Sequence, residues 1–248
     1  MTDTTIIGSY LSPYVRKVLV TLDIKGIPFQ IDPIVPYYAS PEFDAISPLR
    51  RIPVLVDDCV TLADSTVICE YLEDRYPDPP MLPRAPGARA QARWLEEFAD
   101  SRMGEVFIWH LYNQLVIRKF VWGQPPDQAV LTRALEQEIP QILDYLEGQV
   151  PERGFLFGSI AIADVAITTF FRNAAFARWQ MDAERWPGVA GYVARLLDHD
   201  SFARLRPLEE LLLHTPIARH REALLAAGAP VARQTYGTGA PRPGILAT

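Results

Sequence analysis

Residues 77–88 divide the chain, because their first seven positions contain four prolines. Proline has no backbone N–H and cannot continue a helix or join a central strand, so this segment is expected to be irregular. Before it, short β-branched and alternating segments predict strands, and after it apolar residues recur at helical spacing. The segment therefore predicts a boundary between a small mixed α/β domain and an all-helical domain.

The part of the chain before this boundary predicts elements in the order βαβ-α-ββα. They are a strand at 4–8, a helix from Tyr14 to Gly26, a strand at 28–35, a short helix at 40–45, a hairpin within 50–65 and a helix at 66–76. Ser12-Pro13 suits the start of the first helix, with serine as the N-cap and proline at the first helical position. Because the first three elements follow one another closely, their strands are expected to be parallel.

The part after the boundary predicts a bundle of helices. They are expected at 89–120, at 128–149 with an interruption at Pro140, at 163–178, at 188–199 and at 201–213. The helix at 163–178 is apolar on most faces, so it is expected at the centre of the bundle. The Gly-, Pro- and Ala-rich end predicts an irregular tail that packs on the surface or is mobile. The expected division is a domain at 1–79, a linker at 80–88, a helical domain at 89–227 and a tail at 228–248.

Composition and charge argue against several classes of function. A net charge of −6 and a pI near 5.3 disfavour nucleic acid as a partner, because nucleic acid requires a basic surface. Two cysteines are too few for a disulfide-stapled secreted domain. The sequence shows no secretory leader and no apolar run of membrane-spanning length, so a cytoplasmic protein without a membrane partner is expected.

Four motifs in this order resemble the cytosolic glutathione transferase superfamily, and the resemblance covers residues 4–213. The motifs are Ser12-Pro13-Tyr14-Val15-Arg16-Lys17-Val18, Arg51-Ile52-Pro53-Val54-Leu55, the segment 62–72 around Asp64-Ser65, and Phe155-Leu156-Phe157-Gly158 followed by Ile162-Ala163-Asp164. The first resembles the serine-type active-site turn of the theta, delta, zeta and bacterial classes. The resemblance implies an α/β thioredoxin-like N-terminal domain and an all-α C-terminal helical bundle. It also implies a two-fold homodimer and glutathione as the co-substrate.

One position departs from the family pattern. The family carries a hydroxyl residue three positions before the aspartate that opens the buried helix, and this chain has Ala161 there. Loss of a Ser or Thr N-cap costs about 1 kcal/mol. The departure is expected to lower local stability without changing the fold, unless Ser159 caps the helix instead.

The resemblance assigns the thiol chemistry to Ser12. Glutathione reacts as a thiolate, and a hydroxyl that donates a hydrogen bond to the sulfur favours that form, as does a helix N-terminus. On the residues alone, a simple helix N-cap is the more common role of a serine before proline, and the two roles are compatible. Tyr10, in the same turn, is the second choice for the thiolate contact, with lining the cleft wall as its alternative role.

The hairpin region carries the implied contacts to the cysteinyl and glycyl parts of glutathione. Pro53 is expected to be cis, which would turn the backbone of Ile52 outward so that the ligand pairs with it as an added strand. An ordinary trans proline at a strand start is the alternative. Arg51 matches the basic residue that reaches the glycyl carboxylate. The neighbouring Arg50 could do the same, and a solvated loop charge is the alternative for both.

Asp64 and Ser65 match the family's acidic-Ser pair. The backbone N–H and the hydroxyl of Ser65 would hold the γ-glutamyl carboxylate at a helix N-terminus. Asp64 would meet the γ-glutamyl ammonium, across a dimer interface in one version of this hypothesis. Without the resemblance, both residues are equally consistent with a plain helix cap.

A pocket for a small hydrophobic electrophile is implied in the helical half. Its expected lining is Tyr10, Tyr14, Phe107, Trp109, His110, Tyr112 and Asn113. Aromatic side chains suit flat apolar substrates. Aromatic residues at helical spacing are nevertheless more often core residues, and a single histidine is more often structural than catalytic.

The resemblance implies a glutathione transferase, in which the thiolate attacks a small apolar electrophile by conjugation or displacement, as in detoxification. β-Aryl ether cleavage, dehalogenation and peroxide reduction share the geometry and stay open, as does a non-catalytic binding or regulatory member. Cys59 is expected in the hairpin turn and Cys69 in the helix that follows, so the cysteine-type classes fit poorly. No Cys, His, Asp or Glu group has metal-ligand spacing in the sequence, and no metal is expected.

Overall fold

The computed structural model describes residues 4–242, which divide by their contacts into two compact units. The first unit contains the residues up to Pro79 together with those from Asp200 onward, and the second contains Pro80–His199. The division near residue 80 follows the proline-rich segment. Residues 200–227 differ from the sequence-based expectation, because they belong with the first unit and not with the helical bundle.

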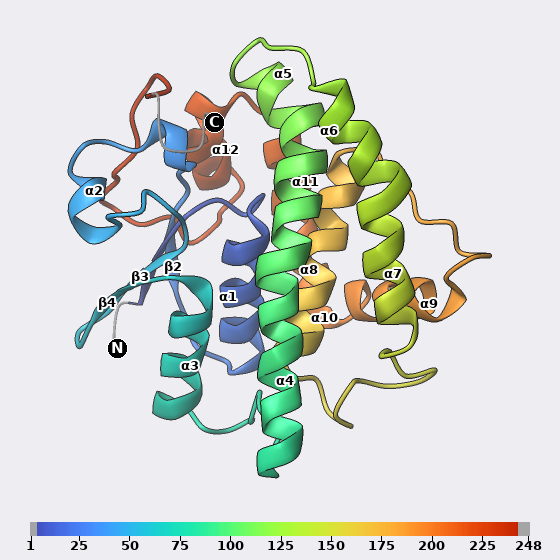
Figure 1. Cartoon of the computed structure of the whole chain (residues 1–248). Coiled ribbons are helices and arrows are strands. Elements are labelled where there is room, and N and C mark those ends of the chain that lie inside the picture. The colour runs from blue at the N-terminus through green and yellow to red at the C-terminus, as the bar shows by residue number, and fades with distance from the viewer. Residues whose placement is uncertain (1–3, 243–248) are drawn as a thin grey trace. The chain divides into compact units, whose positions relative to one another are not determined.

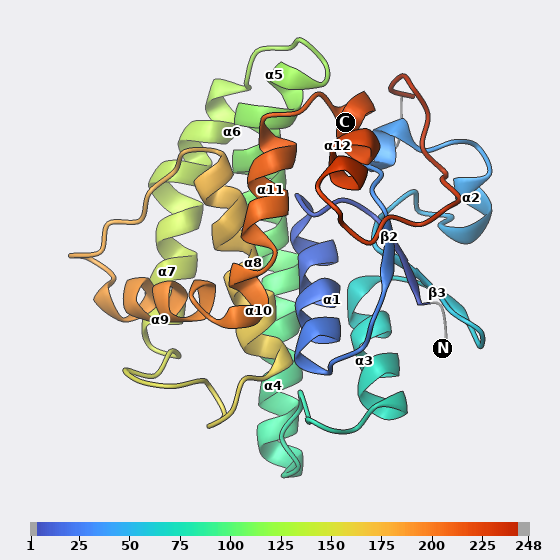
Figure 2. The same ribbon diagram turned by 180° about the vertical axis from the view of Figure 1, so that it is seen from behind.

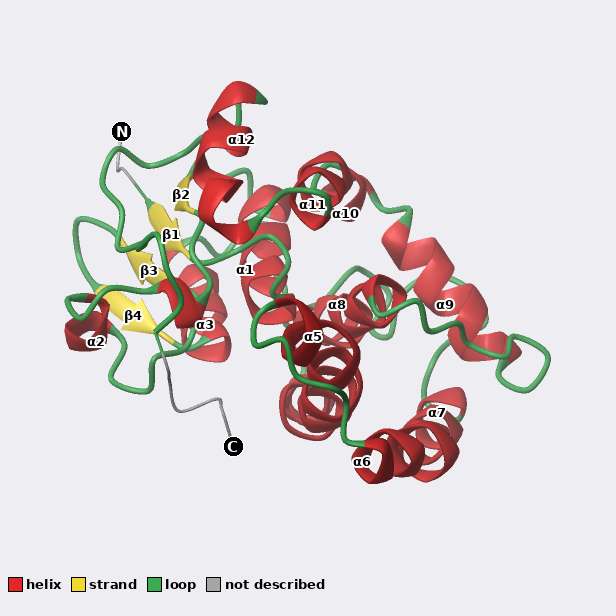
Figure 3. Ribbon diagram, turned by 90° about the horizontal axis from the view of Figure 1, so that it is seen from above, coloured by secondary structure: helices red, strands yellow, loops and turns green. Residues whose placement is uncertain are grey.

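The first unit is built on a four-stranded sheet with the strand order β2-β1-β3-β4. Its strands are β1 (Thr5–Ile7), β2 (Gln30–Asp32), β3 (Val54–Val56) and β4 (Thr61–Ala63). β1 is parallel to β2, whereas β3 is antiparallel to both β1 and β4. Helices α1 (Pro13–Ile24) and α3 (Ser65–Arg75) lie on the same side of the sheet (Figure 3). With η1 (Pro36–Tyr38) and α2 (Phe43–Ile46) between β2 and β3, this is the expected thioredoxin-like βαβ-α-ββα order.

Helix α1 supplies much of the core under this sheet. Its apolar positions recur at helical spacing, and Val15, Val18, Leu19 and Leu22 are all fully buried. Lys25 caps the helix at its C-terminus, and Gly26 follows with a φ of 65°, a left-handed conformation that glycine adopts without a Cβ clash. The local sequence signals therefore place this helix correctly at both ends.

The second unit is a helical bundle around α8. A long helical stretch runs from α4 (Pro86–Phe98) through η2 (Ala99–Ile117) to α5 (Arg118–Phe120), shown in green in Figure 1. The remaining helices are α6 (Gln128–Arg133), η3 (Ala134–Glu138), α7 (Ile139–Glu147), α8 (Ile162–Phe176) and α9 (Pro187–Leu197). Most of α8 is buried, as its apolar faces predict. Within residues 4–242 no helix is long and apolar enough to cross a membrane.

The expected interruption at Pro140 is wrong. Helices α6, η3 and α7 follow one another without a break from Gln128 to Glu147. The segment before the proline, η3, is a π-helix, in which the N–H of Ile139 bonds to the carbonyl of Ala134. A π turn shifts the hydrogen-bond pattern by one residue and widens the helix, which accommodates a residue that has a ring and no N–H.

The start of α8 lacks a side-chain cap at its first position. Ala161 has the extended conformation of an N-cap residue but no acceptor to offer, and Ser159 does not replace it. In a capping box the N-cap side chain and the side chain three residues later each bond to the other's backbone N–H. Asp164 makes the second of these bonds, because its Oδ2 accepts the N–H of Ala161 at 2.8 Å. Its Oδ1 accepts the N–H of Leu156 at 3.0 Å and the hydroxyl of Tyr192 at 2.7 Å. The helix start is therefore stabilised by the Asp164 side chain alone, without a hydrogen bond from an N-cap side chain.

We predict that Ala161→Thr will make the protein more stable than Ala161→Val by about 1 kcal/mol, the contribution of a hydroxyl N-cap. Thr and Val have nearly the same shape, so the pair isolates the hydroxyl from any effect of size at this buried site. The free energy of unfolding in urea measures the difference. Equal stability of the two variants would show that the start of α8 gains nothing from a cap.

The helices after residue 199 complete the first unit. They are α10 (Asp200–Ala203), α11 (Arg206–Leu213), η4 (Ile217–Arg219) and α12 (His220–Ala226). The single helix expected at 201–213 is therefore divided at Arg204-Leu205. The described part of the tail packs on the surface: it runs beside β2 and then toward α2, as the red segment of Figure 2 shows. Residues 243–248 of the expected tail lie outside the described residues.

His220 gives this C-terminal region a titratable group in the core. The side chain is 2 % exposed, and its Nε2 lies 3.0 Å from the carbonyl oxygen of Thr215. Burial holds its pKa below the ordinary value, although backbone carbonyls nearby offset part of that effect. The unfolded chain therefore binds this proton at a higher pH than the folded chain does.

We predict that stability falls as the pH is lowered below about 6.5, the ordinary pKa of histidine, because the unfolded state then takes up the proton first. His220→Gln should make the free energy of unfolding less dependent on pH between about 6.5 and 5. His214→Gln, at an exposed histidine of the same region, provides the control substitution. Urea titrations at several pH values measure the slopes, and parallel curves for wild type and His220→Gln would contradict the prediction.

Candidate functional site

The turn between β1 and α1 presents the hydroxyl of Ser12. The turn is closed by the N–H of Ser12, which donates to the carbonyl of Ser9 at 3.0 Å. Ser12 is also the N-cap of α1, because its Oγ accepts the N–H of Val15 at 3.3 Å. A hydroxyl that accepts one hydrogen bond still has its own hydrogen to donate. The capping role therefore leaves Ser12 able to donate to an anion at the helix N-terminus.

The two tyrosines of the same region are placed differently. Tyr10 is only 2 % exposed, and burial raises the pKa of its hydroxyl to about 12. Tyr14, on the first turn of α1, is half-buried. Ser12, which is half-buried at a helix start, is better placed than Tyr10 to meet a ligand.

A buried ion pair supports this turn from behind. The Arg16 side chain on α1 contacts Glu209 on α11 through its Nε, and these residues are 1 % and 2 % exposed. The same guanidinium donates to the carbonyl of Tyr10 at 3.2 Å. Arg16 lies inside the Ser-Pro motif, but nothing in the sequence indicated a partner on a helix beyond residue 200.

A second link joins α1 to the first turn of α3. Lys17 is fully buried, and its Nζ donates to the hydroxyl of Thr66 at 3.0 Å. Thr66 directly follows Ser65, so this contact fixes the helix start that carries the expected carboxylate site. Sequence reasoning missed Lys17, although a lysine on the buried face of a predicted helix is a visible signal.

The Ile52–Pro53 bond is cis, as the resemblance implies. Ile52 lies close to the Ser12 turn, because a Cβ added to Gly8 would be 3.3 Å from the Cβ of Ile52. Within residues 4–242, neither the N–H nor the carbonyl of Ile52 is engaged in a hydrogen bond. The backbone here can therefore pair with an extended peptide.

Asp64 and Ser65 form the start of α3. Asp64 has a φ of 89° and caps the helix, with its Oδ1 accepting the N–H groups of Thr66 at 2.9 Å and Val67 at 3.2 Å. Ser65 is 4 % exposed, and its hydroxyl has no hydrogen-bond partner among the described residues. The register that pairs Val54 with Ala63 brings this helix start beside the Ile52-Pro53 segment. An unpaired hydroxyl and the first N–H groups of a helix together suit a carboxylate.

The two arginines before Ile52 have different surroundings. Arg50 has a φ of 52° and pairs with Asp44, the Nη2–Oδ2 distance being 3.0 Å. Arg51 is exposed and makes no side-chain ion pair within the described part of the chain. Its backbone is held by Ser47, whose Oγ accepts the N–H of Arg51 at 3.0 Å and donates to its carbonyl at 2.7 Å. Arg51 is therefore the guanidinium available to a ligand.

Five of the seven residues expected to line an electrophile pocket lie on η2, and the other two are Tyr10 and Tyr14. Phe107 is fully buried, with its ring 5.3 Å from that of Phe171 and 5.9 Å from that of Trp179, which is the placement of a core residue. Tyr112 is 9 % exposed, whereas Trp109, His110 and Asn113 are half-buried. His110 is paired, because its Nδ1 lies 2.7 Å from Glu138 Oε2.

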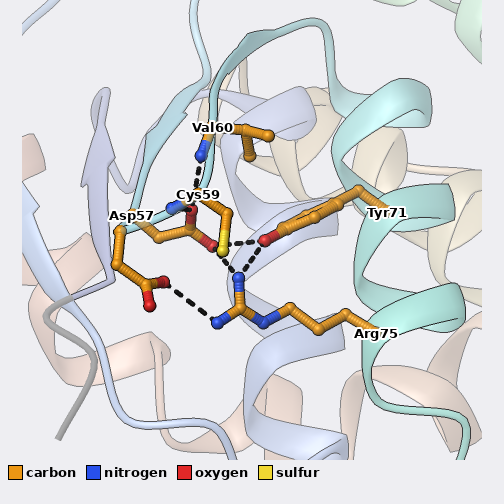
Figure 4. Close-up of polar contacts among 6 residues, drawn as sticks. Asp57, Cys59, Val60, Tyr71 and Arg75 are labelled. Carbon is orange, nitrogen blue, oxygen red and sulfur yellow. Dashed lines mark hydrogen bonds and ion pairs between the residues drawn. The ribbon is translucent and has the colours of Figure 1, made fainter.

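An acidic cluster lies in the β3–β4 turn (Figure 4). Asp57, Asp58 and Cys59 have ligand-type atoms within 4.8 Å of one another, a grouping that the sequence analysis did not foresee. The carboxylates are already used: Asp57 accepts the hydroxyl of Tyr71 at 2.6 Å and Arg75 at 3.1 Å, and Arg75 also reaches Asp58 at 3.0 Å. Hydrogen bonds from Tyr71 and from backbone N–H groups outweigh the effect of burial and lower the pKa of Asp57. The cluster is an ionic lock between the turn and α3.

Comparison with known proteins places this geometry in a family. The family model described as the glutathione S-transferase N-terminal domain matches residues 6–80, and the one described as the glutathione S-transferase C-terminal domain matches residues 128–195. The chain is 31% identical over 209 residues to the uncharacterized GST-like protein YibF of Escherichia coli, with 82% of this chain and 98% of the relative covered. The chain belongs to the glutathione S-transferase superfamily.

Other members of the superfamily carry different names. A stringent starvation protein A homolog of Haemophilus ducreyi is 38% identical over 191 residues, which cover 77% of this chain and 84% of that protein. A glutathione S-transferase of Methylobacterium radiotolerans, solved in complex with glutathione sulfonate, is 26% identical with a TM-score of 0.68 and covers 82% of this chain and 93% of its own. The superfamily relatives of this chain thus include both named transferases and proteins not named as enzymes.

We predict that Glu209→Ala will lower the free energy of unfolding by about 3 kcal/mol or more, because it breaks a buried ion pair by removing one partner. Glu222→Ala, on the neighbouring α12, is the matched control, since it breaks the solvent-exposed pair between Glu222 and Arg219. Exposed pairs contribute little, so that variant should unfold close to wild type. Urea unfolding followed by tryptophan fluorescence measures both, and similar losses for the two variants would contradict the importance of the buried pair.

Proposed function

We propose that this protein is a glutathione transferase in which Ser12 stabilises the glutathione thiolate. The single observation that carries the proposal is the Ser12 hydroxyl at the N-terminus of α1, which accepts the N–H of Val15 and keeps its own hydrogen for a sulfur anion. A thiolate placed there gains a hydrogen bond and the favourable end of the helix dipole. Both effects lower the pKa of the thiol, so more of it reacts near neutral pH.

The rest of glutathione is assigned to the open polar groups of the same unit. The backbone of Ile52 pairs with the cysteinyl residue, and the N–H and hydroxyl of Ser65 hold the γ-glutamyl carboxylate. Asp64 meets the γ-glutamyl ammonium with the carboxylate oxygen that does not cap α3. Arg51 binds the glycyl carboxylate, which is supported by the engagement of its neighbour Arg50 with Asp44.

In the proposed reaction the thiol proton leaves to solvent and the thiolate forms a bond to an electrophilic carbon. In a displacement, the bond between that carbon and its leaving group breaks, and the leaving group departs with the electron pair. In a conjugate addition, the electrons move onto the substrate, which then takes up a proton. The second substrate is proposed to be small and apolar, with the half-buried side chains Trp109, His110 and Asn113 of η2 as candidates to contact it. Ether cleavage and dehalogenation are displacements of the same kind.

A non-catalytic binding protein is the second candidate, favoured by the 38% identity to a stringent starvation protein A homolog. Glutathione-agarose separates the two candidates. A transferase is retained and released by millimolar glutathione, whereas a member that has lost the co-substrate passes through.

We further propose a cytoplasmic homodimer. Size-exclusion chromatography with light scattering would test the dimer.

We predict that Ser12→Ala will lower kcat/KM for a standard aryl halide electrophile by about 100-fold, the effect of removing one hydrogen bond to a developing or bound anion. The ultraviolet absorbance of enzyme-bound thiolate should fall at neutral pH. The pH at which that absorbance appears should rise, because the thiol pKa returns toward its free value of about 8.5.

Tyr10→Phe is the matched control, since it removes the rival hydroxyl of the same turn. It should leave the thiolate signal within about twofold of wild type, because a buried tyrosine is not the proposed donor. A thiolate signal that survives in Ser12→Ala and disappears in Tyr10→Phe would transfer the role to Tyr10.

A further inference from the structure

The described end of the chain adds to the edge of the sheet. Residues 229–242, called here the C-terminal strap, first run parallel to β2 at Ile31 and Val231. The N–H of Ile31 donates to the carbonyl of Pro230 at 2.8 Å, and the N–H of Ala232 donates back to Ile31 at 2.9 Å. These bonds cover the β2 edge, which would otherwise expose unpaired backbone groups.

The strap is then anchored on a buried carboxylate. Asp32, at the end of β2, is 1 % exposed, and its Oδ2 accepts the N–H of Tyr236 at 2.7 Å. Arg221 on α12 lies 3.5 Å from its Oδ1. The ring of Tyr236 packs edge-on against that of Phe43 in α2, with the centroids 6.1 Å apart. The strap is thus fixed at the point where it leaves the sheet edge.

Beyond this anchor the strap follows the connection between β2 and α2. Gly237 and Ala39 form an antiparallel bridge, and the N–H of Ser40 donates to the carbonyl of Tyr236 at 2.7 Å. The N–H of Thr238 donates to the carbonyl of Tyr38, also at 2.7 Å. Covering the edge of β2 does not require these contacts, because they lie outside that strand.

Arg242 ends the described strap on the residue that also holds Arg50. Its guanidinium donates to Asp44 Oδ1 at 2.7 Å and to the carbonyl of Ser40 at 3.1 Å. The other oxygen of Asp44 pairs with Arg50 at 3.0 Å. The bond to Arg242 is the largest cause that holds the pKa of Asp44 below its ordinary value. Asp44 therefore pairs with both Arg242 and Arg50, and Arg50 directly precedes Arg51 in the chain.

We propose that the C-terminal strap is a positioning element for the glycyl-carboxylate end of the glutathione site, and that Arg242 acts through Asp44 and Arg50 on Arg51. The inference rests on the proposed function, because it concerns the same site. Arg242 neutralises and orients Asp44, which keeps Arg50 in its left-handed conformation at the start of the Arg51-Ile52 segment. With Arg50 engaged in this way, Arg51 is the arginine left to receive the carboxylate.

The test compares two ligands on the full chain by isothermal titration calorimetry: glutathione, and its monoethyl ester blocked at the glycyl carboxylate. Arg242→Ala should weaken glutathione binding roughly tenfold, the effect of one charge-assisted contact, and leave binding of the ester within about twofold. Arg242→Lys should restore much of the loss because it keeps the positive charge. Arg233→Ala removes an exposed strap arginine and should bind both ligands as wild type does.

A coupling measurement separates positioning from general destabilisation. In an Arg51→Ala background, Arg242→Ala should have no further effect on glutathione binding, because the group it positions is absent. Equal losses for glutathione and the ester, or no loss at all, would overturn the role of the strap while leaving the proposed function intact. Failure of the wild-type protein to bind glutathione would overturn the proposed function and this inference together.

Discussion

The buried pair of Arg16 and Glu209 is the constraint on which much of the first unit depends. Taking either charge out of water alone costs several kcal/mol, so Arg16 can occupy its place in the core only if a carboxylate accompanies it. Glu209 comes from α11, so the pair links α1 to a helix beyond residue 199 within the same unit. Because Arg16 also donates to the carbonyl of Tyr10, the same pair supports the Ser12 turn.

The features predicted correctly from the sequence are those that a few neighbouring residues decide. Ser12-Pro13 sets the start of α1, Gly26 follows its end, and Asp64 caps α3 through its own side chain. Each depends on hydrogen bonds that span two to five residues, so the local sequence contains the whole cause. The order βαβ-α-ββα followed from such signals.

The features that the sequence did not reveal depend on partners far along the chain. The composition of the tail predicts no regular structure, yet the tail pairs with β2 because Ile31 offers an open edge and Asp32 an acceptor. Pro140 predicts a break, but the π turn before it absorbs the proline. Phe107 is compatible with a pocket or a core, and only the rings of Phe171 and Trp179 around it decide for the core.

The polar groups of the first unit fall into two sets, and the contrast bears on function. Arg16, Lys17 and Asp57 are charged groups that other side chains satisfy, so folding alone accounts for them. The backbone of Ile52, the hydroxyl of Ser65 and the guanidinium of Arg51 have no such partners within residues 4–242. Ile52 and Ser65 are buried, and buried polar groups without partners weaken a fold unless water or a ligand satisfies them. An open strand edge, a hydroxyl at a helix start and a free cation together match an extended peptide with a carboxylate at each end, which is the form of glutathione.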